Sequence, residues 1–339
     1  MKRVLVIALT LTAALSAALF AGGGQQAGGG NVHAVVFKST GNPFGEKLMD
    51  GFETGVKEQG GTVIRRAPDL PTAEAQIQII DQLIAQKVAS ITISANDFDA
   101  LQPVLTKAKN AGINIVTADS AVNAASRSLH INQADTKLIG ETLVEAAFDQ
   151  AGGSGEIAIL SATSQASNQN AWIAVMEETL KQAKYANLKL VKIAYGDDLR
   201  DKSVSETEGL LASYPNLKVI VAPTTVGIAA AAKVITDRGL IGKVKITGLG
   251  LPSEMADYIT NGSCPYMFLW NPIDLGYLAS YAAKALADGA ITGKIGDKFG
   301  GGKLGSYTVV NAADGGTEVV LGPPFKFEPS NINEWKSVY

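Results

Sequence analysis

The sequence is poor in the residues that form covalent cross-links and metal sites. Its 339 residues include one cysteine, Cys264, and two histidines, His33 and His130. One cysteine excludes an internal disulfide, and a zinc site or a Cys/His catalytic pair needs more ligands than these residues supply. Such a chain must be held together by a large core, which a hydrophobic content of 46% permits.

Clustered positive charge is missing as well. Basic and acidic residues are mixed along the chain, and the net charge is −3 at pH 7. A nucleic-acid-binding surface would show clustered Lys and Arg, so we expect no nucleic-acid partner. The segment 41–45, Gly-Asn-Pro-Phe-Gly, lacks the G-x-G-x-x-G spacing of a dinucleotide-binding turn. We therefore expect neither a cofactor nor a bound metal.

The N-terminus has the three parts of an export signal. Met1-Lys2-Arg3 supplies positive charge, residues 4–20 are almost all apolar, and the small residue Ala21 follows. We predict a signal peptide at 1–21, cleaved near Ala21, and a Gly-rich spacer at 22–30. A retained membrane anchor is the alternative; the glycines that follow, in place of basic residues, favour removal. The mature protein would be periplasmic, or exposed at the cell surface if the organism has no outer membrane.

From residue 31 onward, short β-rich runs alternate with longer helical segments. Several runs are continuously apolar, as in parallel strands covered on both faces, and apolar positions 101, 104, 105 and 108 form one buried helical stripe. A mature length of about 310 residues is large for one core, so we predict an α/β fold with two Rossmann-like lobes. The expected strands are 32–39, 62–66, 90–94, 113–118, 156–161, 188–195, 218–222, 243–247 and 265–270.

Ligands of parallel α/β sheets bind beyond the carboxyl ends of the strands. The first strand ends at Lys38, and Asn42 and Phe44 follow in the next turn and helix; Asp119 and Ser120 follow the fourth strand. A carboxylate such as Asp119 can accept hydrogen bonds from two ligand hydroxyls. The alternatives are a solvated lysine, a core phenylalanine and a turn-capping aspartate. A Lys38–Asp119 pair across the site is a hypothesis.

Later strand ends are rich in neutral hydrogen-bonding groups. Residues 162–172 contain Asn168, Gln169 and Trp172 but no arrangement of nucleophile and base. Carboxamides both donate and accept, which suits a hydroxyl-rich ligand; a polar loop that caps a helix is the alternative. Two further strand ends supply Pro223, Thr224, Thr225 and Trp270, and then Asn271 and Asp274, which either face the cleft or cap the next helix.

Several segments together resemble the rhamnose-binding proteins of bacterial ABC importers, within the ribose-binding-like periplasmic family. The likeness runs from about residue 31 to the C-terminus. The segments that carry it are 94–97 (Ser-Ala-Asn-Asp), 160–163 (Leu-Ser-Ala-Thr), 168–172 (Asn-Gln-Asn-Ala-Trp), 195–198 (Tyr-Gly-Asp-Asp), 222–227 (Ala-Pro-Thr-Thr-Val-Gly), 247–255 and 269–277.

The resemblance implies a type I periplasmic-binding-protein fold, in which two lobes joined by three hinge crossings close on a sugar. It places one lobe at 31–131 plus 272–306 and the other at 132–271 plus 307–339. It also implies a monomer that delivers its ligand to ABC permease subunits. A DNA-binding regulator of the same fold would carry a helix-turn-helix where this chain has its export signal, and the few histidines and single cysteine argue against an enzyme.

Related receptors for the furanosyl signal autoinducer-two have ligand contacts that correspond in part. Lys38, Asp119, Gln169 and Pro223 match those contacts. Asn168 replaces an acid of the related receptors, and Thr224-Thr225 replaces Asp-Ala. The lost acid favours a neutral sugar. Leu249, which stands where ribose-binding relatives have a carboxylate, predicts an apolar corner suited to the methyl group of rhamnose.

Overall fold

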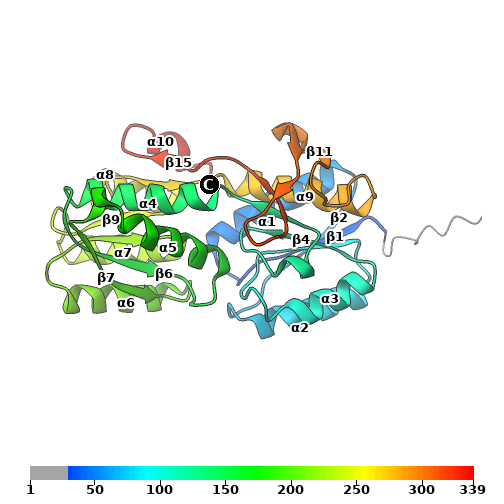
Figure 1. Cartoon of the computed structure of the whole chain (residues 1–339), viewed down its shortest axis with the longest axis horizontal. Coiled ribbons are helices and arrows are strands. Elements are labelled where there is room, and N and C mark those ends of the chain that lie inside the picture. Colours follow the sequence, from blue (N-terminus) through cyan, green and yellow to red (C-terminus); the bar gives the residue numbers. More distant parts are fainter. Residues whose placement is uncertain (1–29) are drawn as a thin grey trace, which may run out of the picture.

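Two β-sheets flanked by helices divide the structure into two lobes (Figure 1). The computed structural model describes residues 30–339; the predicted signal peptide at 1–21 and nearly all of the predicted spacer at 22–30 lie outside the described residues. The strands meet as parallel neighbours within each main sheet, with a single antiparallel pair at one edge. The predicted α/β class with two parallel-sheet lobes is therefore confirmed.

The first lobe is built on a seven-stranded sheet in the order β13-β14-β5-β4-β3-β1-β2. Its continuous apolar strands are buried on both faces, as the sequence pattern predicts. The strands are β1 (Val32–Val36), β2 (Thr62–Arg66), β3 (Ser90–Ile93), β4 (Asn114–Ala118), β5 (Leu129–Asn132), β13 (Val310–Asn311) and β14 (Thr317–Val320).

Two helices on one face of this sheet cross at backbone contact. A Cβ atom on Gly276 would lie 1.8 Å from the carbonyl oxygen of Leu48, and one on Gly51 would lie 1.9 Å from that of Ile273. Only glycine allows so close a crossing, and it joins the two helices whose N-termini reach the space between the lobes. They are α1 (Pro43–Glu58) and α9 (Pro272–Ala287); α2 (Ala73–Ala85), α3 (Gln102–Asn110) and the short η1 (Ala124–Ser126) complete the lobe.

The second lobe is built on a four-stranded parallel sheet in the order β7-β6-β8-β9. Helices α4 and α5 pack together, as do α6 and α7. The strands are β6 (Gly155–Ser161), β7 (Leu188–Tyr195), β8 (Leu217–Ala222) and β9 (Lys245–Gly248). The helices are α4 (Thr136–Gln150), α5 (Ser167–Leu180), η2 (Ala183–Tyr185), α6 (Arg200–Ser213), α7 (Thr225–Asp237) and α8 (Pro252–Asn261).

The C-terminal segment leaves the first lobe and ends on the second. Strand β15 (Phe325–Phe327) pairs antiparallel with β10 (Met267–Leu269), and α10 (Ile332–Trp335) packs on α8. The ring of Phe327 contacts Trp335 and Tyr339 edge to face, which anchors the end of the chain. A small ribbon of β11 (Lys298–Gly300) and β12 (Ser306–Thr308), with η3 (Gly302–Leu304) between them, lies beside α9.

The chain passes between the sheets at three places: after β5, after β10 and after β14. The resemblance places 307–339 in the second lobe, but β14 pairs in parallel with β5 and β13 pairs with β14, so these two strands extend the sheet of the first lobe. We therefore propose that the third crossing lies at 321–324. The crossings placed near 131/132 and 271/272 stay predictions.

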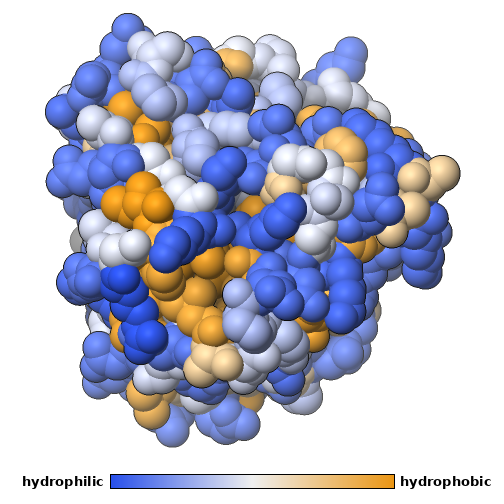
Figure 2. All heavy atoms as spheres, turned by 90° about the vertical axis from the view of Figure 1, so that its left-hand side faces the viewer, coloured by the Kyte–Doolittle hydropathy of each residue, from blue (hydrophilic) through white to orange (hydrophobic). Residues whose placement is uncertain are grey.

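The end of the second lobe that faces away from the first is mostly hydrophilic (Figure 2). Apolar side chains gather in a hollow near the middle of this face, with hydrophilic residues around them. Among residues 30–339, no helix has both the length and the apolar character needed to cross a membrane.

Candidate ligand-binding site

A cavity of about 360 Å³ lies between the lobes, where the carboxyl ends of both parallel sheets meet. This is the edge at which parallel α/β sheets bind ligands. The walls of the cavity are formed by Phe37, Lys38, Asn42, Phe44, Asp119, Asn168, Gln169, Trp172, Asp198, Pro223, Thr224, Thr225, Leu249, Leu269 and Trp270.

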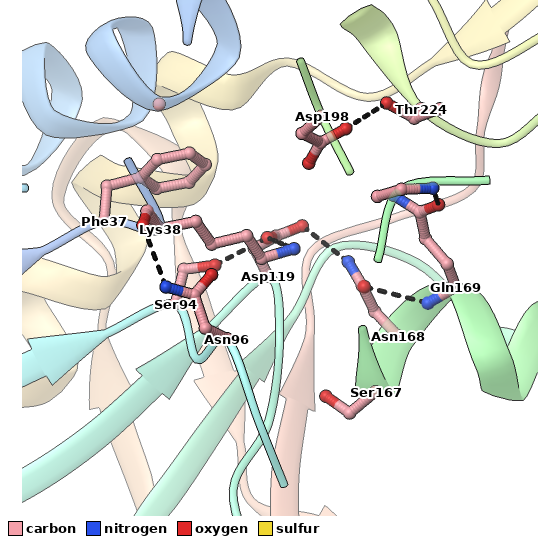
Figure 3. A network of polar contacts seen from close by, with 12 residues as sticks. Phe37, Lys38, Ser94, Asn96, Asp119, Ser167, Asn168, Gln169, Asp198 and Thr224 are labelled. Carbon is pink, nitrogen blue, oxygen red and sulfur yellow. Dashed lines mark hydrogen bonds and ion pairs between the residues drawn. The ribbon is translucent and has the colours of Figure 1, made fainter. Parts of the chain in front are cut away.

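A buried ion pair forms the first-lobe wall of this cavity (Figure 3). Lys38 Nζ lies 3.2 Å from Asp119 Oδ2, and both side chains are about nine-tenths buried or more, with exposed fractions of 7% and 6%. Ser94 Oγ donates a 2.7 Å hydrogen bond to the same carboxylate oxygen. Asp119 has a left-handed φ of 67°, a conformation that aspartate tolerates. Charges buried this deeply need such partners to offset their desolvation.

Two amide side chains hold the loops behind the ion pair. Gln76 Nε2 donates to the carbonyls of Phe37 and Ser94, at 3.2 and 2.8 Å. Asn96 Nδ2 donates to the carbonyl of Lys38 at 2.9 Å, and its own backbone N–H donates to Gln76 Oε1 at 2.9 Å. Strand ends β1 and β3 are thereby tied to α2, so the ion pair is attached to a rigid frame.

The two lobes touch directly beside the cavity. Asn168 Nδ2 donates to Asp119 Oδ1 at 3.0 Å, and Ser167 Oγ donates to the backbone carbonyl of Ala121 at 3.0 Å. Asn168 and Ser167 begin α5 in the second lobe, whereas Asp119 and Ala121 follow β4 in the first. The described conformation therefore has the lobes closed on each other at this point.

The second-lobe wall is made mainly of neutral polar groups. Gln169 Oε1 accepts hydrogen bonds from Ser161 Oγ at 2.7 Å and from the backbone N–H of Ala162 at 2.8 Å, which fixes the side chain against the end of β6. Thr224 caps α7 by accepting from the N–H of Gly227 at 3.4 Å, and its hydroxyl donates to Asp198 Oδ1. Burial raises the pKa of Asp198, while Lys38 across the cavity lowers it.

Aromatic rings form the apolar part of the lining. The ring centroids of Trp172 and Trp270 lie 5.7 Å apart, those of Phe44 and Trp270 6.3 Å apart, and those of Phe37 and Phe44 6.1 Å apart. This chain of edge and tilted contacts crosses from one lobe to the other. The indole Nε1 of Trp270 is buried and has no acceptor among residues 30–339. Polar groups on one side and aromatic faces on the other match an amphipathic ring-shaped ligand.

A model of the periplasmic binding protein domain matches residues 33–291, most of the chain and nearly all of this framework. The chain belongs to the periplasmic binding protein family. A solute-binding protein of an ABC transporter from Clostridium phytofermentas, solved with bound L-rhamnose, is 52% identical, covers 91% of this chain and 99% of its own, and has a TM-score of 0.90. The predicted type I fold and the resemblance to sugar-binding proteins of importers are confirmed.

Two more distant relatives widen the picture. The D-allose-binding periplasmic protein of Escherichia coli is 24% identical over 272 residues, which are 78% of this chain and 86% of that protein. LsrB from Clostridium saccharobutylicum, solved with AI-2, is 22% identical, covers 90% of this chain and 99% of its own, and has a TM-score of 0.85. The last likeness concerns the fold alone.

The structure brings most predicted site residues of this binding protein to the cavity, but not all. Ser120 is fully buried and does not line the cavity. Asn271 caps α9, since its Oδ1 accepts from the N–H groups of Ile273 and Asp274 at 2.9 and 3.3 Å. Asp274 accepts from Asn271 Nδ2 at 2.9 Å and pairs with Lys303 at 3.2 Å, away from the cavity. For Asn271 the structure supports helix capping, and for Asp274 it shows neither a cap nor a place in the cavity lining.

Three lining residues were not predicted: Phe37, Leu269 and Asp198. Phe37 and Leu269 lie at the ends of apolar strands. At such positions a side chain in the core and a side chain lining a cavity give the same sequence pattern. Asp198 lies three residues after the end of β7 at Tyr195, so the strand-end rule was sufficient to find it. The described residues contain no group of three His, Cys, Asp or Glu side chains suited to a metal ion.

Proposed function

We propose that this protein is the extracytoplasmic receptor of an ABC sugar importer and that its ligand is a monosaccharide, with rhamnose the first choice. The 52% identical solute-binding protein with bound L-rhamnose is the observation that carries the proposal, because its chain is matched over almost its whole length. The cavity lies between lobes that are closed on each other, at the carboxyl ends of both parallel sheets. We expect a monomer that passes its ligand to the permease.

The chemistry of the cavity supports a neutral deoxy sugar. Asp119 and Lys38 supply an acceptor and a donor for hydroxyls, and the carboxamide of Asn168 can do both. Leu249 and Leu269, with the aromatic rings, supply an apolar wall. The methyl group at carbon six of rhamnose would lie against that wall, where a hydroxymethyl group would lose its hydrogen bonds to water.

Transport requires that the ligand-bound receptor differ in conformation from the ligand-free receptor. The contacts Asn168–Asp119 and Ser167–Ala121 join the lobes at the cavity. A ligand bound by both lobes adds its own contacts to these and shifts the population toward the closed form. The permease would then recognise the spacing of the two lobe surfaces.

A receptor for autoinducer-two is the second candidate, favoured by the retention of Lys38, Asp119 and Gln169 in the cavity. The neutral Asn168 and Thr224 argue against it. The relatives are components of sugar transport.

Isothermal titration of the mature protein, refolded to remove co-purified sugar, tests the proposal. Rhamnose should bind one to one, and L-mannose, which differs only by a hydroxyl at carbon six, should bind more weakly. Ribose and autoinducer-two complete the panel. Heat with none of the four would reject the rhamnose assignment, and autoinducer-two binding more tightly than rhamnose would select the second candidate. Asp237→Asn, on the exposed face of α7, serves as the unaffected control variant.

A further inference from the structure

Two adjacent aspartates follow β7, and they face different surroundings. Asp197 pairs with Lys202 on α6, at the protein surface. Asp198 lines the cavity, with one carboxylate oxygen accepting the Thr224 hydroxyl. Both have left-handed φ values, 54° and 53°. The chain thus adopts an uncommon backbone here for two successive residues, and the second of them directs its carboxyl group into the cleft (Figure 3).

The second oxygen of Asp198 accepts no hydrogen bond from residues 30–339. Among these residues, Thr224 is the hydrogen-bond partner of the carboxylate, and that bond goes to Oδ1. Figure 3 shows the other oxygen directed toward the space that Lys38, Asp119 and Asn168 surround. Asp198 is half-buried in the wall of the cavity. A ligand that enters the cavity can therefore reach this oxygen and supply a donor to it.

The charges around the cavity favour a ligand with hydroxyl groups over one with an anionic group. Lys38 already contacts Asp119 on the first-lobe side. Asp119 and Asp198 belong to opposite lobes, and the ammonium group of Lys38 is the positive charge near both of them. The pKa of Asp198 is raised overall, because burial raises it more than Lys38 lowers it. A ligand with an anionic group would add a third negative charge to this space, whereas hydroxyl groups would offer donors to both carboxylates.

We propose that Asp198 is the ligand-selecting acceptor of the second lobe: its free carboxylate oxygen accepts a hydrogen bond from one ring hydroxyl of the bound sugar. This inference rests on the proposed function, and it names a residue that determines which sugar is accepted. Asp119 and Asp198 hold hydroxyls from opposite lobes, so the ring itself joins the lobes. Sugars that lack the hydroxyl, or that present it with the opposite configuration, are rejected because Asp198 stays unpaired.

Asp198→Asn tests the acceptor directly. Asparagine tolerates the left-handed backbone, and its Oδ1 can still accept from Thr224, so the turn is preserved. The change replaces the free acceptor oxygen with a donor NH2 group. Titration calorimetry should show about a 10- to 100-fold loss of rhamnose affinity, as expected for a lost hydrogen bond to a charged group. Asp197→Asn, the same change one residue earlier, should leave the affinity unchanged.

Deoxy sugars identify the hydroxyl and separate this inference from the proposed function. The 2-, 3- and 4-deoxy analogues of rhamnose are titrated against the wild type and Asp198→Asn. One analogue should bind the wild type more weakly than rhamnose does. For Asp198→Asn, the same analogue and rhamnose should bind almost equally, because the variant already lacks the hydrogen bond that the missing hydroxyl would make. Wild-type binding of rhamnose with additive losses for all three analogues would overturn the role of Asp198. No rhamnose binding by the wild type would instead reject the ligand.

A purely structural role has a different signature. If Asp198 only held the β7–α6 turn, Asp198→Asn would lower the thermal stability of the ligand-free protein. We expect the opposite at pH 7–8, because the raised pKa of Asp198 means that its ionised form is disfavoured in the folded state. The stability advantage of the variant should shrink as the pH falls and Asp198 takes up a proton. A destabilised variant with unchanged rhamnose affinity would contradict the proposal.

Discussion

The two lobes present different chemistry to the same cavity. The first lobe supplies an ion pair held mainly by its own frame. Lys38 and Ser94 contact Oδ2 of Asp119 within that lobe, and Asn168 of the second lobe donates to Oδ1. The second lobe supplies neutral amide and hydroxyl groups and one carboxylate, Asp198, with an oxygen still free. The first half is pre-organised, and the second half is completed by what binds.

This difference suggests a division of labour in closure. A pre-organised wall can hold a ligand while the lobes are apart, because the Lys38–Asp119 ion pair and the Ser94–Asp119 hydrogen bond form within the first lobe. The lobe with the unsatisfied oxygen gains most when the lobes meet around the ligand. Selectivity should therefore depend on second-lobe residues, and first capture on the Lys38–Asp119 pair.

Removing Asp119 should have the largest effect. Asp119→Ala leaves the buried ammonium group of Lys38 unpaired, which typically costs about 3–5 kcal/mol of stability, and rhamnose affinity should fall more than about 100-fold. Urea unfolding and calorimetry measure the two losses separately. The double variant Lys38→Met/Asp119→Leu should regain stability without regaining affinity. Restored binding in the double variant would show that the pair is structural and not a ligand contact.

The close crossing of α1 and α9 gives the second prediction. Gly276→Ala would force a methyl group against the carbonyl of Leu48, so the helices must separate, at a cost of roughly 2–4 kcal/mol. In the second lobe, Gly209 on α6 has no heavy atom within 4 Å of an added Cβ. Gly209→Ala should therefore stabilise the protein by about 0.5–1 kcal/mol. The midpoints of urea unfolding measure both changes in stability. Equal effects of Gly276→Ala and Gly209→Ala would contradict the argument from close helix contact.

Acid should weaken the first lobe before the second. Both histidines lie in the first sheet, His33 on β1 and His130 on β5, and burial is the main cause that lowers their pKa values, to about 4 and about 3. Their folded pKa values are below the unfolded value of 6.5, so the unfolded state binds more protons between these limits. The stability present above pH 6.5 is therefore lost as the pH falls, by roughly 2 kcal/mol per histidine at pH 5.

Hydrogen exchange can locate this loss. Between pH 7 and pH 5, and after correction for the intrinsic rates, amides of β1 and β5 should lose more protection than those of β6 and β8. In His130→Asn, an amide group can replace the contact of His130 Nδ1 with Thr117 Oγ1, 2.9 Å in the wild type. This variant should lose less protection on acidification. Equal loss in both lobes would point to carboxylates in place of the histidines.

Much of the fold was predictable from the sequence because the main strands are continuous apolar runs. Each of the predicted strands overlaps an observed one. Strand β5 was missed because its four residues include His130 and Asn132, whose burial depends on the neighbours β4 and β14. Strand β14 comes from the far end of the chain, so its place in the first sheet depends on tertiary pairing that no local pattern records.

The cavity was predicted from the rule that ligands bind at strand ends, and this rule has a clear limit. It names a position but not a direction. Asp197 and Asp198 both follow β7, yet one pairs with Lys202 and the other faces the cavity. Asn271 satisfies backbone N–H groups of α9, which is as good a reason for an asparagine at a strand end as ligand binding. Only the folded backbone separates these alternatives.

The smallest predicted effect concerns the contact between the lobes outside the cavity. Ser167 Oγ donates to the carbonyl of Ala121, and Ser167 does not line the cavity. Ser167→Ala should reduce rhamnose affinity only about 2- to 10-fold, because one neutral hydrogen bond contributes about 0.5–1.5 kcal/mol. The loss should appear as faster dissociation, since the bond forms only after the ligand has been captured.

Stopped-flow measurement of both rate constants distinguishes closure from direct binding. Ser205→Ala, which removes a hydrogen bond within α6, is the matched control and should leave both rates unchanged. A slower association in Ser167→Ala would mean that the lobes already meet before the sugar arrives. In that case the second lobe would take part in first capture, and the contrast between a capturing lobe and a selecting lobe would not hold.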